Sequence, residues 1–387
     1  MSCSRFNTGG LWRFWSCRRE PAEVTKIERW FNGCRKVLHL VVLVLTLADG
    51  QLEAGDIVEF HGQTMGTTYS VKIAQAQLTQ ETVGSIRARI EERLKEINRQ
   101  MSHYQPDSEL SLFNRSPGTE PVRVSRELAE VVRFSLVLHQ RSAGAFDPTL
   151  GPLVELWGFS AKGTVLEPPA PESIAAARAK TGAQRLRVTE QCELKKDIQG
   201  LELNLGGLAK GFAADELARL LRDQQLTNTL VRIGGELVAS GHNAMGDPWS
   251  IGIASPLPES AEDDFEAVVR LSGKAVSTSG NYRQFFVDEK GRRYGHIIDP
   301  QTGMPVQHNL ASVTVVADNC LTADGLATSL YVMGHERGLR WIETWTNAAA
   351  LFIVTRPDGS LEQHQSAQFH RYRVSTNSSS PPPVQAR

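Results

Sequence analysis

The residues best suited to chemistry are a carboxylate and a hydroxyl one helical turn apart, Asp324 and Thr328. Side chains at i and i+4 share one face of a helix, so both oxygens point the same way near a predicted helix start. Gly334 follows the last apolar position of the segment, which is typical of the end of a helix. Two hard oxygen donors suit a hard cation such as Mg²⁺ better than zinc. The pattern also fits an ordinary helix with an acidic first turn.

The second candidate for chemistry is the histidine of the segment His296-Ile297-Ile298-Asp299-Pro300. Its ordinary pKa lets the imidazole accept a proton near neutral pH. His296 would therefore suit a general base for a hydroxyl nucleophile, provided that the fold brings it near the Asp324 helix. A lone histidine before an apolar pair is more often a structural residue. The sequence leaves both interpretations open.

Two glycine pairs lie at the predicted ends of strands. The segment 204–211 (Asn-Leu-Gly-Gly-Leu-Ala-Lys-Gly) runs from a strand into a helix. Exposed N–H groups and the positive helix end would attract an anion there, and Lys210 adds charge. Its spacing matches neither a Walker A nor a dinucleotide-binding loop. A tight turn with a solvated lysine is the alternative, and Gly234-Gly235 likewise fits a plain turn between strands.

Two further segments carry groups that suit a flat ring and phosphates. In the segment 144–149 (Gly-Ala-Phe-Asp-Pro-Thr), Phe146 would face the ring while the backbone of Ala145 and Asp147 hydrogen-bonds it. The alternative is a loop capped by an aromatic cluster. The segment 278–283 (Thr-Ser-Gly-Asn-Tyr-Arg) offers hydroxyls and an arginine for phosphates, or else forms a polar turn before a strand at Phe285.

The elements that must position these groups interleave between residues 56 and 373. Periodicity predicts helices at 80–100, 125–142 and 208–221, a short one after Pro171, and strands at 68–73, 229–233, 250–254, 267–271, 312–316 and 350–355. Many of these strands are one turn apart with no helix between them, so antiparallel pairing should dominate. We therefore predict an α+β fold with mixed, largely antiparallel sheets and flanking helices.

Composition narrows the function. The chain has 387 residues, a net charge of −1, 41% hydrophobic and 22% charged residues, so nothing in its charge favours nucleic-acid binding. Five cysteines occur without zinc-type spacing. Three of them precede the folded part, and the pairing of Cys192 with Cys320 is left open by their spacing.

Neither end of the chain has the composition expected of a folded domain. Residues 1–50 read as an extension plus a signal or anchor segment, because Arg35-Lys36 precedes an apolar run at 37–48. That run fits a secretory segment or short anchor better than a full span of roughly 20 residues. We expect residues 56–373 to form the functional domain. Residues 374–387, rich in Ser and Pro, are predicted to be a disordered tail.

Taken together, these segments resemble the ApbE family, FAD:protein FMN transferases, from Gly62 to about Gly334. The matching motifs follow family order: residues 64–69 (Thr-Met-Gly-Thr-Thr-Tyr), 101–104 (Met-Ser-His-Tyr) with 107–110 (Asp-Ser-Glu-Leu), 144–148 (Gly-Ala-Phe-Asp-Pro), 207–211 (Gly-Leu-Ala-Lys-Gly), 234–236 (Gly-Gly-Glu), 278–282 (Thr-Ser-Gly-Asn-Tyr), 296–300 (His-Ile-Ile-Asp-Pro) and 323–325 (Ala-Asp-Gly). Each motif alone is ambiguous, but their order along the chain is specific.

The resemblance implies a reaction. Mg²⁺-dependent cleavage of the FAD pyrophosphate would pass FMN, as a phosphoester, to a threonine hydroxyl of an exported target protein and release AMP. FAD is then a substrate and Mg²⁺ the cofactor. The implied partner is an acceptor protein, such as a subunit of a membrane redox complex.

The resemblance also implies roles for individual residues. The metal would be held by the side chains of Asp324 and Thr328 and the backbone oxygen of Gly207, and His296 would be the base. FAD would lie between two halves of the fold, in contact with Met65, Tyr104, Ala145, Phe146, Asp147, Asn204, Lys210 and Ile298.

Two positions depart from the family pattern. Asn204 stands where many members carry aspartate, which keeps the hydrogen bonding but removes a charge. Many members attach lipid to a cysteine just after the apolar run, whereas here Asp49-Gly50 follows it and Cys34 precedes it. We expect an exported protein on the periplasmic side of the inner membrane without a clear lipid site, and the sequence leaves open both an uncleaved N-terminal anchor and plain secretion.

Two other functions fit the same residues. In an FAD pyrophosphatase, water replaces the threonine and free FMN and AMP are released. In a non-catalytic FAD-binding protein, bound FAD survives the addition of Mg²⁺. The Asp324–Thr328 pair and His296 favour an enzyme over the binding protein, while the choice between transfer and hydrolysis needs an assay.

Overall fold

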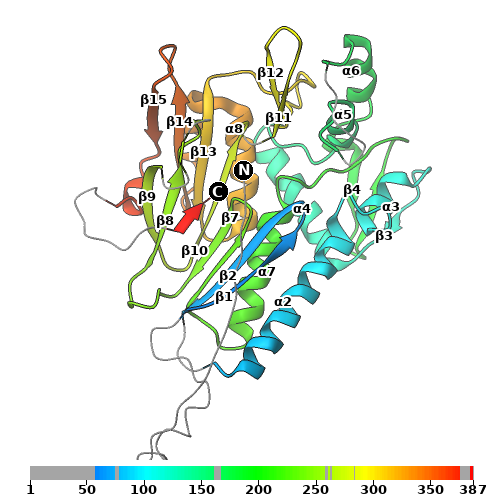
Figure 1. Cartoon of the computed structure of the whole chain (residues 1–387). Helices are drawn as coiled ribbons and strands as arrows, with labels where there is room; N and C mark the ends of the chain where they lie inside the picture. The colour runs from blue at the N-terminus through cyan, green and yellow to red at the C-terminus, as the bar shows by residue number, and fades with distance from the viewer. Residues whose placement is uncertain are drawn as a thin grey trace, which may run out of the picture. The chain divides into compact units, whose positions relative to one another are not determined.

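Figure 1 shows the protein as a computed structural model, which describes residues 57–74, 78–160, 167–257, 260–261, 264–282, 284–374 and 384–386. These residues belong to one compact unit of the chain, Leu52–Arg387. The two halves expected from the sequence are therefore not separate units. The leader predicted at 1–50 lies outside the described residues. Of the helices that are described, none has the length and apolarity to cross a bilayer.

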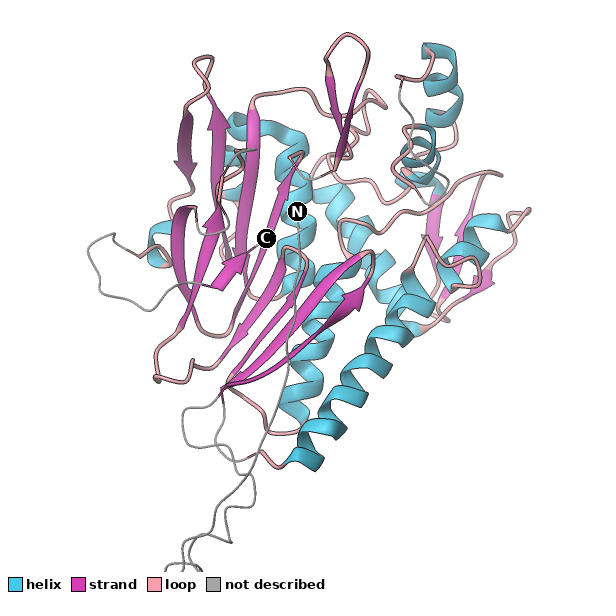
Figure 2. Cartoon of the chain, viewed as in Figure 1, coloured by secondary structure: helices cyan, strands magenta, loops and turns pink. Residues whose placement is uncertain are grey.

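An antiparallel sheet of eight strands forms the centre of the fold (Figure 2). In spatial order its strands are β1 (Ile57–Thr64), β2 (Thr67–Ala74), β6 (Thr229–Ile233), β7 (Glu236–Ser240), β10 (Lys274–Gly280), β13 (Leu310–Ala317), β14 (Ala348–Thr355) and β15 (Leu361–Gln365). Two-residue turns close the β1–β2 and β6–β7 hairpins. In the first turn Met65 and Gly66 both have positive φ (50° and 72°), as tight hairpin turns require.

Both faces of the central sheet are buried, as strand β14 illustrates. Its residues alternate between two hydrophobic clusters: Phe352 belongs to the core on one side, and Leu351 and Ile353 to the core on the other. A strand covered on both faces reads as a continuous apolar run, as residues 348–354 do.

The described part of the chain contains seven α-helices, three of which pack on one face of this sheet. They are α2 (Gln80–Met101), α3 (Glu109–Arg115), α4 (Arg126–Arg141), α5 (Gly151–Leu156), α6 (Pro171–Arg178), α7 (Ala209–Asp223) and α8 (Cys320–Ile342), with 3₁₀ turns at Ala183–Arg185 and Phe369–Arg371. Helix α7 packs on β6 and β7, α8 packs on β10 and β13, and α2 packs on α7 and β1 (Figure 1). The side chains of Thr79, Ser108, Ser125 and Asn319 cap the starts of α2, α3, α4 and α8.

Three smaller sheets complete the described fold. A sheet of β8 (Trp249–Ala254), β9 (Phe265–Leu271) and β16 (Val384–Ala386) supplies apolar residues to the core on the face opposite the helices. The other two are β3 (Val122–Arg123), β5 (Glu193–Lys196) and β4 (Leu186–Val188), and the hairpin of β11 (Phe285–Val287) and β12 (Arg293–Gly295). The inner face of this hairpin packs on Trp157.

The prediction of an α+β fold with largely antiparallel sheets is confirmed, since β16–β8 is the only parallel pairing among the described strands. Two details differ from the sequence prediction. Residues 278–280, for which a polar turn was one alternative, are the end of β10. Strand β1 was not predicted, because only Val58 and Phe60 give it an apolar inward face. Within the segment 374–387, predicted to be a disordered tail, residues 384–386 pair with β8 as β16.

The two cysteines of the described part do not pair. Cys192 and Cys320 are both free. Cys320 is fully buried at the start of α8, where it behaves as a small apolar residue.

We predict opposite effects from two glycine-to-alanine changes in helices. A Cβ at Gly211 of α7 would clash with the carbonyl oxygen of Cys320 and lie 2.9 Å from the Cβ of Asp324. Gly211→Ala should therefore force α7 and α8 apart and lower the free energy of unfolding by about 1–3 kcal/mol. At Gly84 of α2 a Cβ meets no atom within 4 Å, and Gly84→Ala should stabilise the protein by about 1 kcal/mol. Denaturant unfolding of both variants checks this, and equal effects would contradict the close α7–α8 contact.

Candidate active site

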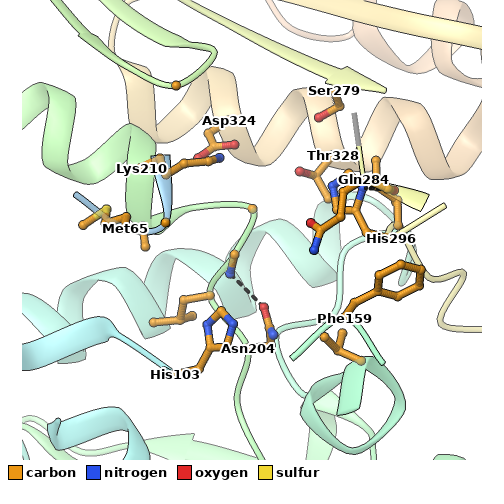
Figure 3. Close-up of a pocket in the computed structure, with 18 of the residues that line it drawn as sticks. Met65, His103, Phe159, Asn204, Lys210, Ser279, Gln284, His296, Asp324 and Thr328 are labelled. Atoms are coloured by element: carbon orange, nitrogen blue, oxygen red, sulfur yellow. Dashed lines mark hydrogen bonds between the residues drawn. The ribbon is translucent and has the colours of Figure 1, made fainter. Parts of the chain in front are cut away.

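A cavity of about 550 Å³ opens where the β1–β2 turn, the end of α2, the start of α7, the end of β10, the β11–β12 hairpin and α8 come together. All twelve residues that the sequence proposed for the site line this cavity: Met65, Tyr104, Ala145, Phe146, Asp147, Asn204, Gly207, Lys210, His296, Ile298, Asp324 and Thr328. Figure 3 shows several of them around it. The structure thus brings the proposed set together, while the part each residue plays stays a prediction.

The glycine turn before α7 lies against the part of α8 that carries Asp324 and Thr328. A Cβ on Gly207 would lie 2.6 Å from Thr328 Oγ1, so the turn can approach α8 this closely only because residue 207 is glycine. Asp324 is 2% exposed, and its Oδ2 accepts a hydrogen bond of 3.1 Å from the N–H of Gly211. Helix α8 kinks at Gly334 (φ 74°, ψ 172°), where the sequence predicted a helix end.

The chemistry of this donor set fits a hard cation. A carboxylate, a hydroxyl and the carbonyl of a glycine turn are oxygen ligands, and the remaining positions around Mg²⁺ are commonly filled by phosphate and water oxygens. In the described part of the chain, no three His, Cys, Asp or Glu residues are grouped so as to hold a metal. The arrangement therefore suits Mg²⁺ and offers nothing to a thiolate- or imidazole-seeking metal.

Lys210 is held between two carboxylates. Its Nζ lies 3.1 Å from Oε1 of Glu236, a residue that is 3% exposed. Burial alone would lower the Lys210 pKa, but Asp324 and Glu236 outweigh burial and raise it. The lysine is therefore charged and paired, and the alternative of a solvated lysine is wrong.

The two carboxylates that share the Lys210 ammonium, Glu236 and Asp324, differ in their other hydrogen-bond partners. Oε1 of Glu236 also accepts a hydrogen bond from Ser277 Oγ at 3.3 Å, whereas its buried Oε2 has no hydrogen-bond partner among the described residues. Burial raises the pKa of Asp324 to about 7, although Lys210 pulls it down. Two buried carboxylates against one ammonium leave a site that a cation would neutralise.

His296 follows β12 and lies on the other side of the cavity from Lys210 (Figure 3). Its Nδ1 lies 3.3 Å from the carbonyl oxygen of Gln284, and its ring packs edge-on against Phe159. Burial lowers the His296 pKa to about 4, so the imidazole is neutral at pH 7. When Nδ1–H donates to Gln284, Nε2 is left as a free proton acceptor. A general base needs such a free nitrogen, but the lowered pKa makes His296 a weaker base than the ordinary imidazole expected from the sequence.

The aromatic groups of the cavity differ in exposure. Tyr104 is 47% exposed and its ring centroid lies 4.0 Å from that of His103, so these two rings form an accessible surface for stacking. Phe146 is only 4% exposed and belongs to the main core. Its backbone is fixed by Ser142 Oγ, which accepts from its N–H at 3.0 Å, and by His139 Nδ1, 2.8 Å from its carbonyl oxygen. The burial of Phe146 favours a backbone contact over ring stacking.

Asp147 and Asn204 shape the loops that carry them. Oδ1 of Asp147 accepts hydrogen bonds from the N–H (2.8 Å) and hydroxyl (2.5 Å) of Thr149. Oδ1 of Asn204 accepts from the N–H of Gly206 at 2.8 Å, the dashed line in Figure 3. An amide oxygen is sufficient for this bond, so asparagine can replace aspartate in holding the glycine turn.

Sequence reasoning missed several lining residues. Glu236 was assigned only to a turn, and His103 only to a motif, although burial lowers the His103 pKa to about 4. Gln284 and Phe159, which contact His296, had no signal that could reveal them, because their role depends on the hairpin. Arg283, proposed for phosphates, lies outside the described residues.

We predict that Glu236→Gln weakens Mg²⁺ binding about tenfold. Without the Glu236 carboxylate, the positive charge of Lys210 is balanced by Asp324 alone and repels the cation more strongly. Calorimetric titration of the nucleotide-free protein with Mg²⁺ measures this. Asp299→Asn is the matched control, because that carboxylate caps a turn outside the cavity. Unchanged Mg²⁺ affinity in Glu236→Gln would show that the two carboxylates do not share the lysine.

Comparison with known proteins agrees with this geometry. The sequence model of the ApbE family matches residues 65–352. The chain is 37% identical to an FAD:protein FMN transferase of Haemophilus influenzae (86% of this chain, 95% of the relative) and 38% identical to that of Vibrio cholerae (84% and 95%). It is also similar to the solved structures of the flavin transferase ApbE from Vibrio cholerae (TM-score 0.74, 38% identity, covering 82% of this chain and all of the other) and of an ApbE protein from Thermotoga maritima (0.72, 29%, 83% and all). This chain therefore belongs to the ApbE family, and like its named relatives it is a transferase.

Proposed function

We propose that this protein is a Mg²⁺-dependent FAD:protein FMN transferase that attaches FMN through a phosphoester to a threonine of an exported acceptor protein. The names of its relatives support flavin transfer as the reaction. The observation that carries the finer proposal is the cavity, where an oxygen-donor cluster, a neutral histidine and an accessible aromatic pair face one space. A dinucleotide with a pyrophosphate between two ring systems needs these three features.

The residues at the start of α7 would receive the pyrophosphate. Gly206 and Gly207 lead into the N-terminus of this helix, whose dipole favours negative charge. Asp324, Thr328 and the carbonyl of Gly207 would hold Mg²⁺ beside it. The ion supplies neutralisation of the charge that develops on the phosphate oxygens during transfer.

His296 would take the proton of the acceptor hydroxyl. The threonine oxygen then forms a bond to the phosphorus of the FMN half, the bond from that phosphorus to the bridging oxygen breaks, and AMP leaves with the electron pair. Nε2 of His296 is the atom left free for this proton by the contact at Nδ1. The low His296 pKa keeps the base form available at neutral pH.

The proposal includes export. The basic pair Arg35-Lys36 before the apolar run at 37–48 supports a signal or anchor that delivers the protein to the periplasmic side of the inner membrane. An acceptor there, such as a subunit of a membrane redox complex, would meet the cavity outside the cytoplasm.

Incubation of the protein with FAD, Mg²⁺ and membrane proteins of the source organism tests the reaction. Covalent flavin fluorescence on a protein band, together with stoichiometric AMP, supports transfer. Release of free FMN and AMP without a labelled band means hydrolysis, and intact FAD after Mg²⁺ addition means a binding protein.

We predict that Asp324→Ala abolishes Mg²⁺-dependent AMP release while the protein stays folded, because the variant lacks the one charged metal ligand. In the wild-type protein, Mg²⁺ affinity should rise as the pH increases through about 7, since the ion needs the carboxylate and burial raises the pKa of Asp324 to that value. Turnover of Asp324→Ala at the wild-type rate, or Mg²⁺ affinity independent of pH between 6 and 8, would remove Asp324 from the metal site.

We predict that His296→Ala slows transfer by about 10²–10⁴-fold while FAD binds with unchanged affinity. At saturating Mg²⁺, the pH–rate profile of the wild-type protein should show no fall near pH 6.5, because the pKa of His296 is lowered to about 4 and the imidazole stays neutral above that value. Equilibrium titration with FAD serves as the control. Loss of FAD binding in the variant would make His296 a nucleotide contact instead of a base.

A further inference from the structure

The outer edge of the β11–β12 hairpin has no role in the proposed reaction, although the ends of the hairpin carry Gln284 and His296. Among the described strands, β11 and β12 pair only with each other. The hairpin nevertheless ends at the chemistry: Gln284, just before β11, and His296, just after β12, both line the cavity and lie close together in Figure 3.

The hydrogen bonds of the hairpin determine which backbone groups face outward. The N–H of His296 donates to the carbonyl of Gln284 at 3.2 Å, so this pair is hydrogen-bonded. In an antiparallel ladder such pairs alternate with pairs whose N–H and C=O groups point away from the partner strand. The N–H and C=O groups of Phe285 and Val287 in β11 therefore point away from β12.

The outer edges of the two strands differ. On β12 the outward carbonyl of Arg293 accepts a hydrogen bond from Gln307 Nε2 at 3.3 Å. On β11, no hydrogen bond from another described residue reaches the outward N–H and C=O groups of Phe285 and Val287. The β11 edge thus offers a short backbone ladder that an extended chain can complete.

The side chains of β11 add an apolar surface to this edge. Phe285 and Val287 are 42% and 50% exposed on one face, while Phe286 between them is buried against Tyr294 on the other. The guanidinium carbon of Arg293 lies 3.5 Å from the centroid of the Phe285 ring. The stacking holds the exposed ring in place, so the outer surface is preformed.

We propose that the outer edge of β11, with Phe285 and Val287, binds the acceptor protein by adding its target segment as a third, extended strand. This inference rests on the proposed transfer of FMN to a protein hydroxyl. In an added strand, the residue opposite Gln284 points to the cavity side, where His296 lies, and its neighbour points outward beside Phe285. The acceptor hydroxyl therefore occupies the position opposite Gln284, next to an apolar residue.

The position of His296 favours this occupant over others. In the proposed reaction, a substrate hydroxyl must reach the histidine from outside the cavity, and the hairpin edge leads a main chain past Gln284, the residue that contacts His296. A second copy of this protein could also pair along a free edge, but it would not supply a hydroxyl that the reaction consumes. The oligomeric state separates these two cases.

Two variants test the edge and the surface separately. The double change Phe285→Ser with Val287→Ser removes the apolar surface and keeps the backbone. Val287→Pro removes an N–H that points away from β12, so the ladder within the hairpin stays intact. The control is Leu112→Ser with Val137→Ser, which changes two equally exposed residues (52% and 54%) that do not line the cavity.

Each full-length variant is incubated with FAD, Mg²⁺ and membrane proteins from cells of the source organism that lack the native gene. Covalent flavin fluorescence in gels measures transfer, and equilibrium titration measures FAD binding. We expect both β11 variants to lose transfer at least about tenfold, since each removes part of a small protein contact. FAD affinity should stay within about twofold of wild type, and the control should transfer normally.

The outcomes distinguish this inference from the function on which it rests. Transfer at the wild-type rate by the serine double variant overturns the docking surface. Loss of FAD binding together with transfer assigns the hairpin to nucleotide binding instead. A change from dimer to monomer in the serine variant, measured by light scattering, assigns the edge to self-association. Absence of any flavin-labelled band with wild-type protein overturns the proposed function itself. If Val287→Pro has a clearly lower melting temperature than the wild-type protein, the serine double variant alone tests the docking surface.

Discussion

The contact between the glycine turn before α7 and the first turns of α8 is the constraint on which the site depends. Gly207 has no Cβ, so its backbone reaches Thr328, and the N–H of Gly211 reaches Oδ2 of Asp324. Both helices pack on the same face of the central sheet, which fixes their separation. A side chain at either glycine would separate the helices and with them the three oxygen donors.

This close packing also creates the electrostatics. Asp324 and Glu236 are almost excluded from water, and burying two carboxylates is costly unless positive charge lies nearby. Lys210 supplies one such charge and remains protonated because of them. The raised pKa of Asp324 shows that one ammonium does not fully compensate for burial. The divalent cation of the proposed function would complete this balance of charge.

The base and the metal donors come from different parts of the fold. Helix α8 and the glycine turn belong to the layer beside the central sheet, whereas His296 is held by the β11–β12 hairpin through Gln284. In the proposed reaction, these separate supports would let the hairpin present its edge to the acceptor without displacing the proposed metal ligands. A transferase that handles a small dinucleotide and a protein substrate at one centre benefits from this division.

The sequence alone determined the features that depend on local pattern. The i, i+4 spacing of Asp324 and Thr328, the glycine turn leading to Lys210 and the period-two strands were each visible in the chain, and the α+β class followed from them. The order of the motifs along the chain then indicated the ApbE family, which implied a site of twelve residues. All twelve line one cavity in the structure. Local geometry is sufficient here because helix and turn positions are set by residues close in sequence.

Only the tertiary structure decided what depends on contacts between distant segments. No pattern in the chain revealed that Lys210 pairs with Glu236, that Phe146 is buried while Tyr104 is exposed, or that Gln284 orients His296. The pKa values of Asp324 and His296 likewise follow from burial, which is a property of the packed protein and not of any segment. Burial and pairing across the fold arise only when the sheet and its helices assemble, because desolvation requires all of the neighbours to be in place.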